Sequence, residues 1–361
     1  MPDLARTKKA ADDLRDWFEA RGAVPIETSY LQPADTLLDL YGEDIRARAY
    51  TVHDPLRGEL MLRPDFTVPV VEWHMKEGAE PARYTYAGPV FRRQEIDESR
   101  PNEYLQVGFE LFGEDEANAD ATVFGEFAAA LADLKVRAVT GDIGILAAAV
   151  AGLNTTDRRK AALMRHIWRP RRFRQLLDRF GGRLPVPSVR VNLLTKTDPM
   201  ADAHPLIGLR SADEIAERID ALHKDAAAPA LSVTEMGLLD DLLNIREKCP
   251  EALSHLSDLA VDMPEILPAI DRLSARLDAL DDIGVDVDDL DFEAAYGRSS
   301  MEYYDGFVFG FYAADEPDLP PVATGGRYNA LTRQLGQGRA IPAVGGVIRP
   351  ALLVALSEGQ A

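Results

Sequence analysis

The sequence predicts an α+β fold in which an antiparallel sheet flanked by helices is interrupted by a helical insertion. Short apolar segments with strand-like alternation occur in two separate parts of the chain, residues 59–112 and the region after Tyr303. Between them, more than a hundred residues carry apolar side chains mainly at helical spacing. We therefore expect one discontinuous domain, residues 1–136 and 283–361, and a mainly helical inserted region, residues 137–282.

The chain is expected to open with an amphipathic helix. Leu4, Ala11, Leu14 and Phe18 recur at helical spacing. Gly22 stands where such a helix would end, because glycine tolerates the left-handed backbone of a helix terminus.

Strands follow at Glu59–Leu62, Tyr84–Arg93 and Glu103–Phe112, where apolar and polar residues alternate. The last two strands are expected to pair, and the charged segment EIDESRP (residues 95–101) suits a loop longer than a tight hairpin. A helix is predicted over Asp120–Leu134.

The inserted region is expected to begin with a strand at residues 136–144 and then an Ala-rich helix that approaches Asn154. Apolar residues from Ile266 to Leu280 recur every three or four positions, a pattern typical of a coiled-coil face or of a helix packed on a core. We favour the core interpretation. Beyond Tyr303 short aromatic strands and glycine pairs return.

Composition excludes several classes of protein. The chain carries 40 basic and 60 acidic residues, a net charge of −20, and 46% of it is apolar, as in soluble globular proteins. This charge repels polyanions. Apolar runs stay far below the roughly 20 residues of a membrane span. Because no signal-peptide-like apolar core is seen near the N-terminus, a cytoplasmic location is expected.

Metal and cofactor sites are not expected either. Cys249 is the only cysteine, and the six histidines show no metal-ligand spacing. The sequence contains neither a P-loop nor the glycine pattern of dinucleotide binding.

One stretch runs against the overall charge. Residues 157–183 contain ten Lys or Arg and two acids, and most of these cations lie between Arg158 and Arg179. The stretch could bind RNA or an acidic partner, or it could be a solvated helix pair that balances acid elsewhere. The solvated pair is the favoured interpretation.

Polar residues next to predicted strands are the candidates for chemistry. On a strand, Gln106 and Glu110 would share one face, and Gly108 between them would leave room for a ligand. A solvent-facing polar strand would give the same pattern. Asp65, in LRPDFT, could cap a turn or hold the ammonium group of a ligand.

The motifs LRPDFT, FR…Q…G.E, EYYDGFVF, GGRYNAL and PAVGG occur in the order and approximate spacing seen in histidyl-tRNA synthetase, a class II aminoacyl-tRNA synthetase. The chain resembles that family everywhere except in its helical middle. The resemblance implies a class II synthetase-like fold and a histidine-binding pocket, with Arg92 at the position that contacts the α-phosphate of ATP. The implied pocket residues are Asp65, Thr67, Arg92, Gln106, Glu110, Tyr304 and Tyr328.

The chain departs from the synthetase pattern where that family binds ATP. Gln94 replaces a glutamate, and Asn102 replaces an arginine. Ser299 stands at the arginine of the family's RGLDYY element, with Arg298 one residue away, and Leu352 stands at the arginine of GLER. Losing these charge-assisted contacts is expected to remove the grip on the triphosphate.

A kept amino-acid pocket beside a damaged ATP site resembles the regulatory subunits of ATP phosphoribosyltransferase, synthetase-like chains without an anticodon-binding domain. This chain is expected to lack that domain too, because it ends at Ala361 soon after the last motif. The resemblance implies no catalytic residue of its own and no tRNA binding.

It also implies a partner, the short-form catalytic subunit that joins ATP to phosphoribosyl pyrophosphate in the first step of histidine biosynthesis. Self-association, a hetero-octamer of four chains of each kind and feedback inhibition by histidine belong to the same expectation.

Two alternatives stay open. A compact histidyl-tRNA synthetase or stand-alone histidine-adenylating enzyme would keep Arg92 and use Arg298 or Arg349 in place of the lost arginines. An RNA-binding accessory protein would use the segment from Arg158 to Arg179.

Overall fold

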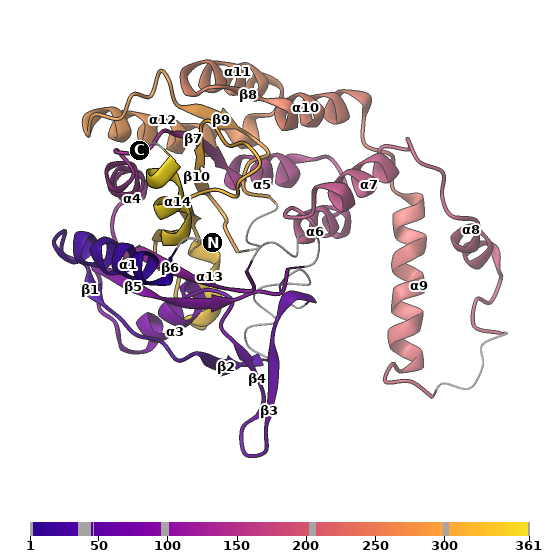
Figure 1. The fold of residues 1–361 in the computed structure, drawn as a ribbon. Coiled ribbons are helices and arrows are strands. Elements are labelled where there is room, and N and C mark those ends of the chain that lie inside the picture. The colour runs from indigo at the N-terminus through magenta and orange to yellow at the C-terminus, as the bar shows by residue number, and fades with distance from the viewer. Residues whose placement is uncertain are drawn as a thin grey trace.

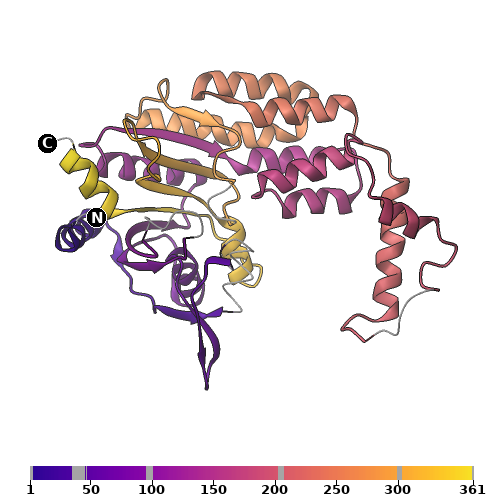
Figure 2. The ribbon, with the colours of Figure 1, turned by 45° about the vertical axis from the view of Figure 1, so that its right-hand side comes forward.

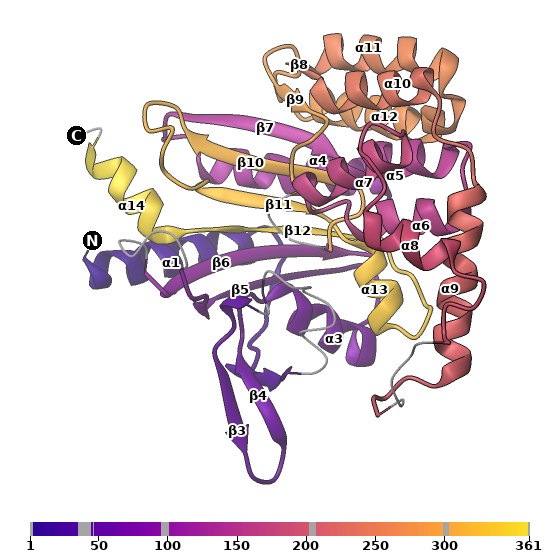
Figure 3. The ribbon, with the colours of Figure 1, turned by 90° about the vertical axis from the view of Figure 1, so that its right-hand side faces the viewer.

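The computed structural model describes residues 3–34, 45, 47–94, 101–201, 207–298 and 303–359. A nine-stranded sheet forms the body of this part of the chain, and Figures 1 and 3 show helices packed on both of its faces. The strands follow one another across the sheet in the order β1 (Val24–Pro25), β5 (Ala82–Phe91), β6 (Glu103–Phe112), β12 (Ala343–Ile348), β11 (Ala323–Arg327), β10 (Phe307–Ala313), β7 (Val136–Asp142), β9 (Asp291–Glu293), β8 (Arg246–Lys248). The predicted α+β fold, a largely antiparallel sheet flanked by helices, is confirmed.

The sheet is antiparallel except for two short pairs, β1 with β5 and β7 with β9. The predicted pairing of the two long strands is confirmed, since β5 and β6 are in register along their whole length. Residues 95–100 of the predicted loop between them lie outside the described residues. A second sheet of three strands, β2 (Leu31–Pro33), β4 (Gly58–Leu62) and β3 (Thr51–Asp54), extends away from the body.

The helices, in chain order, are α1 (Leu4–Glu19), α3 (Thr67–Glu77), α4 (Glu116–Ala130), α5 (Ile143–Gly152), α6 (Asp157–Arg165), α7 (Pro170–Phe180), α8 (Ser188–Thr195), α9 (Ala212–Ala227), α10 (Val233–Asn244), α11 (Cys249–Asp262), α12 (Leu267–Asp282), α13 (Asn329–Leu335), α14 (Pro350–Gly359), with a 3-10 turn at Pro264–Ile266. No described helix is both long and apolar enough to cross a membrane.

Aromatic packing joins α1 and α4 to one face of the sheet. Phe109 of β6 stacks on Phe18 of α1 with ring centroids 5.2 Å apart, and Phe127 of α4 lies 5.5 Å from Phe309 of β10. Because successive strand residues point to opposite faces, the polar residues of β6 project to the other side, toward α3 and α13. The site therefore lies on the face away from α1.

Helix α4 begins four residues before the predicted start at Asp120. Asp115 caps it, because its carboxylate accepts the backbone N–H of Asn118. The apolar stripe of α12 and the turn before it is buried, as the core interpretation predicts; its members are Ile266, Ile270, Leu273, Leu277 and Leu280.

The region of residues 137–282 contributes both to the sheet and to a helical layer. Strand β7 pairs along its whole length with β10, so this part of the region is built into the main sheet. Helices α5, α6, α7, α10, α11 and α12 lie beside the sheet, whereas α8 and α9 project from the body as an arm (Figures 1 and 2). Neither helix of the arm contains a buried residue.

Candidate functional site

The structure brings the predicted site residues together around Glu110. Glu110, on β6, is fully buried, and its carboxylate accepts three hydroxyl hydrogen bonds. Thr67, the first residue of α3, donates to Oε1 at 2.9 Å, Tyr86 of β5 donates to the same oxygen at 2.8 Å, and Tyr328 donates to Oε2. One carboxylate thus joins two strands, a helix and the β11–α13 turn.

Burial governs the protonation of this cluster. It raises the pKa of Glu110 to about 7, although the three hydroxyl donors oppose the rise, and the nearby charge of Asp65 adds to it. The pKa of Tyr86 and Tyr328 is raised well above the ordinary value, first by burial and then by the charge of Glu110. Both phenols therefore remain protonated hydrogen-bond donors at neutral pH.

Asp65 provides the second buried carboxylate, between β4 and α3. Tyr303 donates its hydroxyl to Asp65 Oδ2 at 3.4 Å, and Nη2 of Arg92 lies 3.9 Å from the same oxygen. Tyr304 is buried next to Tyr303, with ring centroids 5.0 Å apart, and burial raises the pKa of its phenol. The site therefore presents two carboxylates, one guanidinium group and several phenols.

Gln106 contributes a buried hydrogen-bond acceptor, its side-chain carbonyl oxygen, to the same face of β6. The side chain is 1% exposed, and its carbonyl oxygen Oε1 accepts no hydrogen bond from any residue that the structure describes. Because Gln106 and Glu110 share a strand face, this acceptor points to the same side of the sheet as the carboxylate. A buried acceptor without a donor costs free energy, which a ligand with an N–H group would recover.

The expectation that Gly108 leaves room for a ligand is wrong. Gly108 lies opposite Tyr86 in the register, and a Cβ at this glycine would be 2.1 Å from Cζ of the tyrosine ring. The space is occupied by the ring that donates to Glu110. Gly345 of β12 serves the same cluster, since a Cβ there would lie 1.6 Å from Glu110 Oε2.

Tyr86 and Tyr303 were not predicted as members of the site. Tyr303 stands next to Tyr304 in the sequence, so strand alternation gave no reason to place both in one cluster. Tyr86 lies on the neighbouring strand, and only the register of β5 against β6 brings it opposite Gly108.

Arg92 also lines a cavity of about 1010 Å³, whose other walls include Leu4, Thr7 and Lys8 of α1. Its Nε donates to the carbonyl of Pro64 at 2.7 Å. Arg349 and Leu352, from the segment that replaces GLER, line the same cavity. Burial lowers the pKa of Arg349, and the charge of Arg92 lowers it further. Leu352 thus presents an apolar side chain on a wall that Arg92 and Arg349 make cationic.

Arg298 does not join the cluster. Its side chain is 4% exposed, donates from Nε to the carbonyl of Ile167 at 2.7 Å and stacks over the ring of Phe173. Burial lowers the pKa of this guanidinium to about 10. Arg298 is therefore packed against α7 and the turn before it; Ser299 lies outside the described residues.

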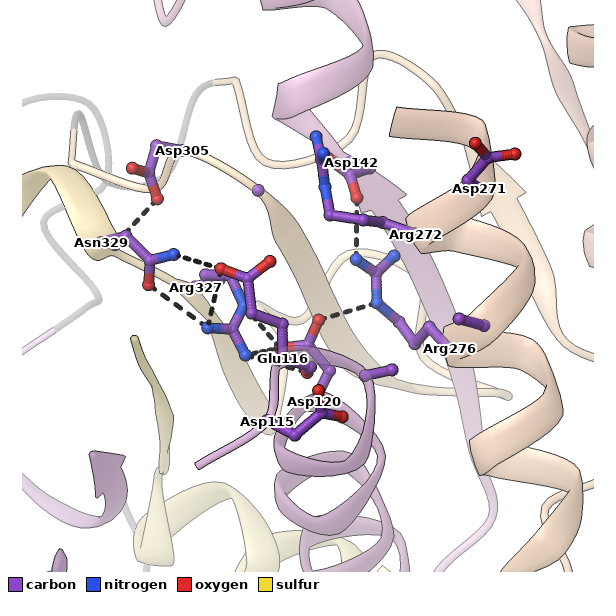
Figure 4. A pocket seen from close by; sticks show the side chains of 13 residues that line it. Asp115, Glu116, Asp120, Asp142, Asp271, Arg272, Arg276, Asp305, Arg327 and Asn329 are labelled. Carbon is purple, nitrogen blue, oxygen red and sulfur yellow. Dashed lines mark hydrogen bonds and ion pairs between the residues drawn. The ribbon is translucent and has the colours of Figure 1, made fainter. Parts of the chain in front are cut away.

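A second cavity, of about 490 Å³, lies beside the cluster and is lined by charged groups (Figure 4). Asp120 of α4 accepts hydrogen bonds from Arg276 at 2.8 Å and Arg327 at 2.7 Å, and Arg276 also donates to Asp142. All four side chains are buried. These ion pairs tie α4 and α12 to the ends of β7 and β11.

The same chain segments serve both the cluster and this cavity. Tyr304 and Tyr328 belong to the cluster, whereas the next residues, Asp305 and Asn329, line the cavity. Asp305 accepts the backbone N–H groups of Asn329 at 2.9 Å and Ala330 at 2.6 Å, and burial raises its pKa to about 6. The charged network therefore holds the backbone on which the tyrosines stand.

Comparison with known proteins matches nearly the whole chain. A family model described as Histidyl-tRNA synthetase matches residues 1–224 and 211–351. A protein of Brucella canis named ATP phosphoribosyltransferase regulatory subunit is 31% identical over 362 residues, covering 94% of this chain and 95% of that protein. A protein of Brucella anthropi with the same name is 30% identical, covering 92% and 93%.

Solved structures share the fold. A Bacillus halodurans protein described as an ATP phosphoribosyltransferase regulatory subunit/histidyl-tRNA synthetase has a TM-score of 0.71 at 22% identity, covering 99% of this chain and 80% of that one. A histidine–tRNA ligase subunit from Alicyclobacillus acidocaldarius has a TM-score of 0.61 at 23% identity, covering 100% and 95%.

Proposed function

Because the chain belongs to the histidyl-tRNA synthetase-like family of ATP phosphoribosyltransferase regulatory subunits, we propose that it is the non-catalytic subunit of that enzyme. Its partner is a short-form catalytic subunit, which is active only in the complex. Free histidine binds this chain and inhibits the complex. The proposal places the complex in the cytoplasm, where ATP and free histidine are both available.

One observation carries the proposal: the polar groups that suit an amino acid are kept together, while an arginine position of nucleotide activation is occupied by Leu352. Asp65, Glu110 and the unpaired oxygen of Gln106 lie on one side of the sheet, in buried positions. Leu352 lines the cavity next to Arg92, where it can offer no charge to a triphosphate.

The cluster matches histidine in its chemistry. The α-ammonium group needs acceptors, which Asp65 and Gln106 Oε1 supply. The imidazole N–H needs a further acceptor near apolar or aromatic surface, which Glu110 and its tyrosines supply. Arg92 is placed to pair with the α-carboxylate. We propose Asp65, Thr67, Arg92, Gln106, Glu110, Tyr304 and Tyr328 as the histidine-binding residues.

Feedback requires that histidine bind the inhibited arrangement of the complex more tightly than the active one. A coupling free energy of about 1 to 3 kcal/mol, typical of allosteric proteins, corresponds to a change in affinity of roughly 5- to 150-fold. The same coupling must appear in both directions, so assembly with the catalytic subunit changes histidine affinity by the same factor.

The test is co-expression with the short-form catalytic subunit, followed by size measurement, an activity assay with and without histidine, and calorimetry with histidine. We expect a mixed complex, activity that depends on this chain, and inhibition that Gln106→Leu abolishes while assembly is kept. Glu59→Gln, at an exposed strand position, is the control. A complex in which histidine binds neither the free chain nor the assembly would refute the sensor role.

The adenylating alternative has one observation in its favour, since Arg92 and Arg349 line the same large cavity. Histidine-dependent exchange of pyrophosphate into ATP distinguishes the two functions. We expect no exchange above background, because the Arg349 guanidinium is already engaged by the carbonyl of Pro321. Exchange that Arg349→Ala abolishes would establish the enzyme instead.

A further inference from the structure

The α6–α7 hairpin concentrates positive charge on an otherwise acidic chain. Nine of the ten cations within residues 157–183 are arginines. The apolar side of the hairpin is buried against the body; its members are Leu163, Ile167, Phe173, Leu177 and Phe180. Most of the cations are therefore left on the solvent side.

Three of these arginines are accounted for by ion pairs within the chain. Arg159 is buried and pairs with Asp225 of α9 at 2.6 Å, which fastens the arm to the hairpin. Arg174 and Arg183 both pair with Asp240 of α10. For these three arginines, the contacts agree with the interpretation that the basic stretch is a helix pair whose charge balances acid elsewhere in the chain.

Five further arginines are exposed and form no ion pair with any described residue; this arginine face consists of Arg158, Arg165, Arg171, Arg172 and Arg179. Arg158 and Arg165 are seven residues apart on or at the end of α6, and Arg172 and Arg179 are seven apart on α7. A spacing of seven places two side chains on the same side of a helix. The two packed helices thus carry matched pairs of uncompensated charge.

His166, in the turn between the helices, experiences this positive field. Burial lowers the pKa of His166, and the charges of Arg169, Arg172 and Arg165 lower it further. Its Nδ1 is buried and has no hydrogen-bond partner in the described part of the chain. Neither Arg165 nor Arg172 pairs with a carboxylate among the described residues, and a docked anionic surface would offset their charge.

The aromatic residues of the hairpin argue against nucleic acid as the occupant. Phe173 is buried, and Trp168 donates its indole N–H to the carbonyl of Tyr304 at 3.0 Å. Phe173 therefore offers no ring to a base, and the Trp168 ring is partly buried against the core, although stacking usually accompanies a basic surface that binds single strands. A net charge of −20 also repels a long polyanion.

We propose that the arginine face docks a carboxylate-rich surface of a protein partner, which in the proposed function is the catalytic subunit. This inference rests on the proposed function and names the surface that the partner uses. Arginine suits the role because its planar guanidinium pairs with carboxylates through two parallel hydrogen bonds and is less strongly hydrated than an ammonium group.

The hairpin also contacts the wall of the proposed histidine pocket. In the turn, the Trp168 indole donates to the carbonyl of Tyr304, and the carbonyl of Ile167 accepts from Arg298. Arg165 and Arg172 flank this turn in the chain. A movement of the Tyr304 backbone on ligand binding would therefore displace the docking surface itself, which gives histidine a short route to the partner.

The experiment measures the affinity of the catalytic subunit for this chain by sedimentation or calorimetry at low and high salt. The double variants Arg165→Glu/Arg172→Glu and Arg158→Glu/Arg179→Glu test the two ends of the face. The control, Arg57→Glu/Lys135→Glu, makes the same change of charge at exposed positions elsewhere.

We expect each face variant to weaken the complex by about tenfold or more and to reduce its salt dependence, while the control changes affinity less than about twofold. Unfolding curves like those of the wild type show that the variants fold.

Each other outcome decides against the inference in a distinct way. If the wild-type chain fails to bind the catalytic subunit, the proposed function fails together with its docking surface. If the complex forms and both face variants match the control, the proposed function stands and the docking surface lies elsewhere. Binding of a labelled single-stranded or duplex RNA by the wild type, lost in both face variants, would replace the protein occupant by nucleic acid.

Discussion

Replacing Glu110 by glutamine should change how the stability of the protein depends on pH. Burial raises the pKa of Glu110 from 4.5 to about 7 in the folded chain. Between these values the native state holds a proton that the unfolded chain has released, so the free energy of unfolding falls as pH rises through this window. A shift of roughly 2.5 units at about 1.4 kcal/mol per unit amounts to a loss on the order of 3 kcal/mol.

The neutral Glu110→Gln side chain keeps the shape of the protonated acid and has no such window. We expect the variant to be about as stable as the wild type near pH 5 and more stable by on the order of 3 kcal/mol near pH 8. Urea unfolding at the two pH values measures this difference. Glu59→Gln, at an exposed position, controls for the removal of a carboxyl group and should leave the pH dependence unchanged.

Identical pH dependence in Glu110→Gln and the wild type would refute the reasoning. Asp305, whose pKa is raised to about 6, contributes a slope of the same sign in both proteins and cancels in the comparison.

Three further predictions concern the surroundings of the cluster. Asp120→Ala leaves two buried guanidinium groups without their shared carboxylate, so urea unfolding should show a loss of about 3 kcal/mol or more; an unchanged midpoint would contradict this. Gly345→Ala places a methyl group against Glu110 and should weaken histidine binding about tenfold in calorimetry, whereas Gly237→Ala, with open space around it, should not. Trp168→Phe removes the hydrogen bond to Tyr304, so it should preserve assembly with the catalytic subunit but reduce inhibition by histidine. Full inhibition of this variant would contradict a signal from the pocket to the hairpin through Trp168.

The strand pattern predicted much of the site. A period of two placed Gln106 and Glu110 on one face of β6, and the pairing of β6 with β5 followed from their neighbouring positions in the chain. These predictions depend on local alternation, which the sequence records directly. The alternative interpretation, a solvent-facing polar strand, is wrong, because the side chains of Gln106 and Glu110 are both buried.

What the sequence did not reveal depends on contacts between distant segments. The Tyr86 ring lies over Gly108 only because of the register between β5 and β6. The side chain of Arg298 points toward α7 because it bonds the carbonyl of Ile167 and stacks on Phe173, both more than a hundred residues earlier in the chain. The separation of the basic stretch into paired arginines and an exposed face depends on Asp240 and Asp225, which lie about 60 residues later in the sequence. No local pattern records such partners.

The two sides of the pocket differ in how firmly they are held, and this bears on how histidine could act on a partner. Asp305 and Asn329, next to Tyr304 and Tyr328, are bonded to each other in the charged network, so the polar side of these segments is fixed by several hydrogen bonds. On the hairpin side the indole of Trp168 donates to the backbone carbonyl of Tyr304. A shift of the Tyr304 backbone on ligand binding would reach the hairpin turn through this contact, while the buried apolar side of the hairpin holds α6 and α7 on the body. A regulatory signal from the pocket should therefore leave through α6 and α7 rather than through the sheet.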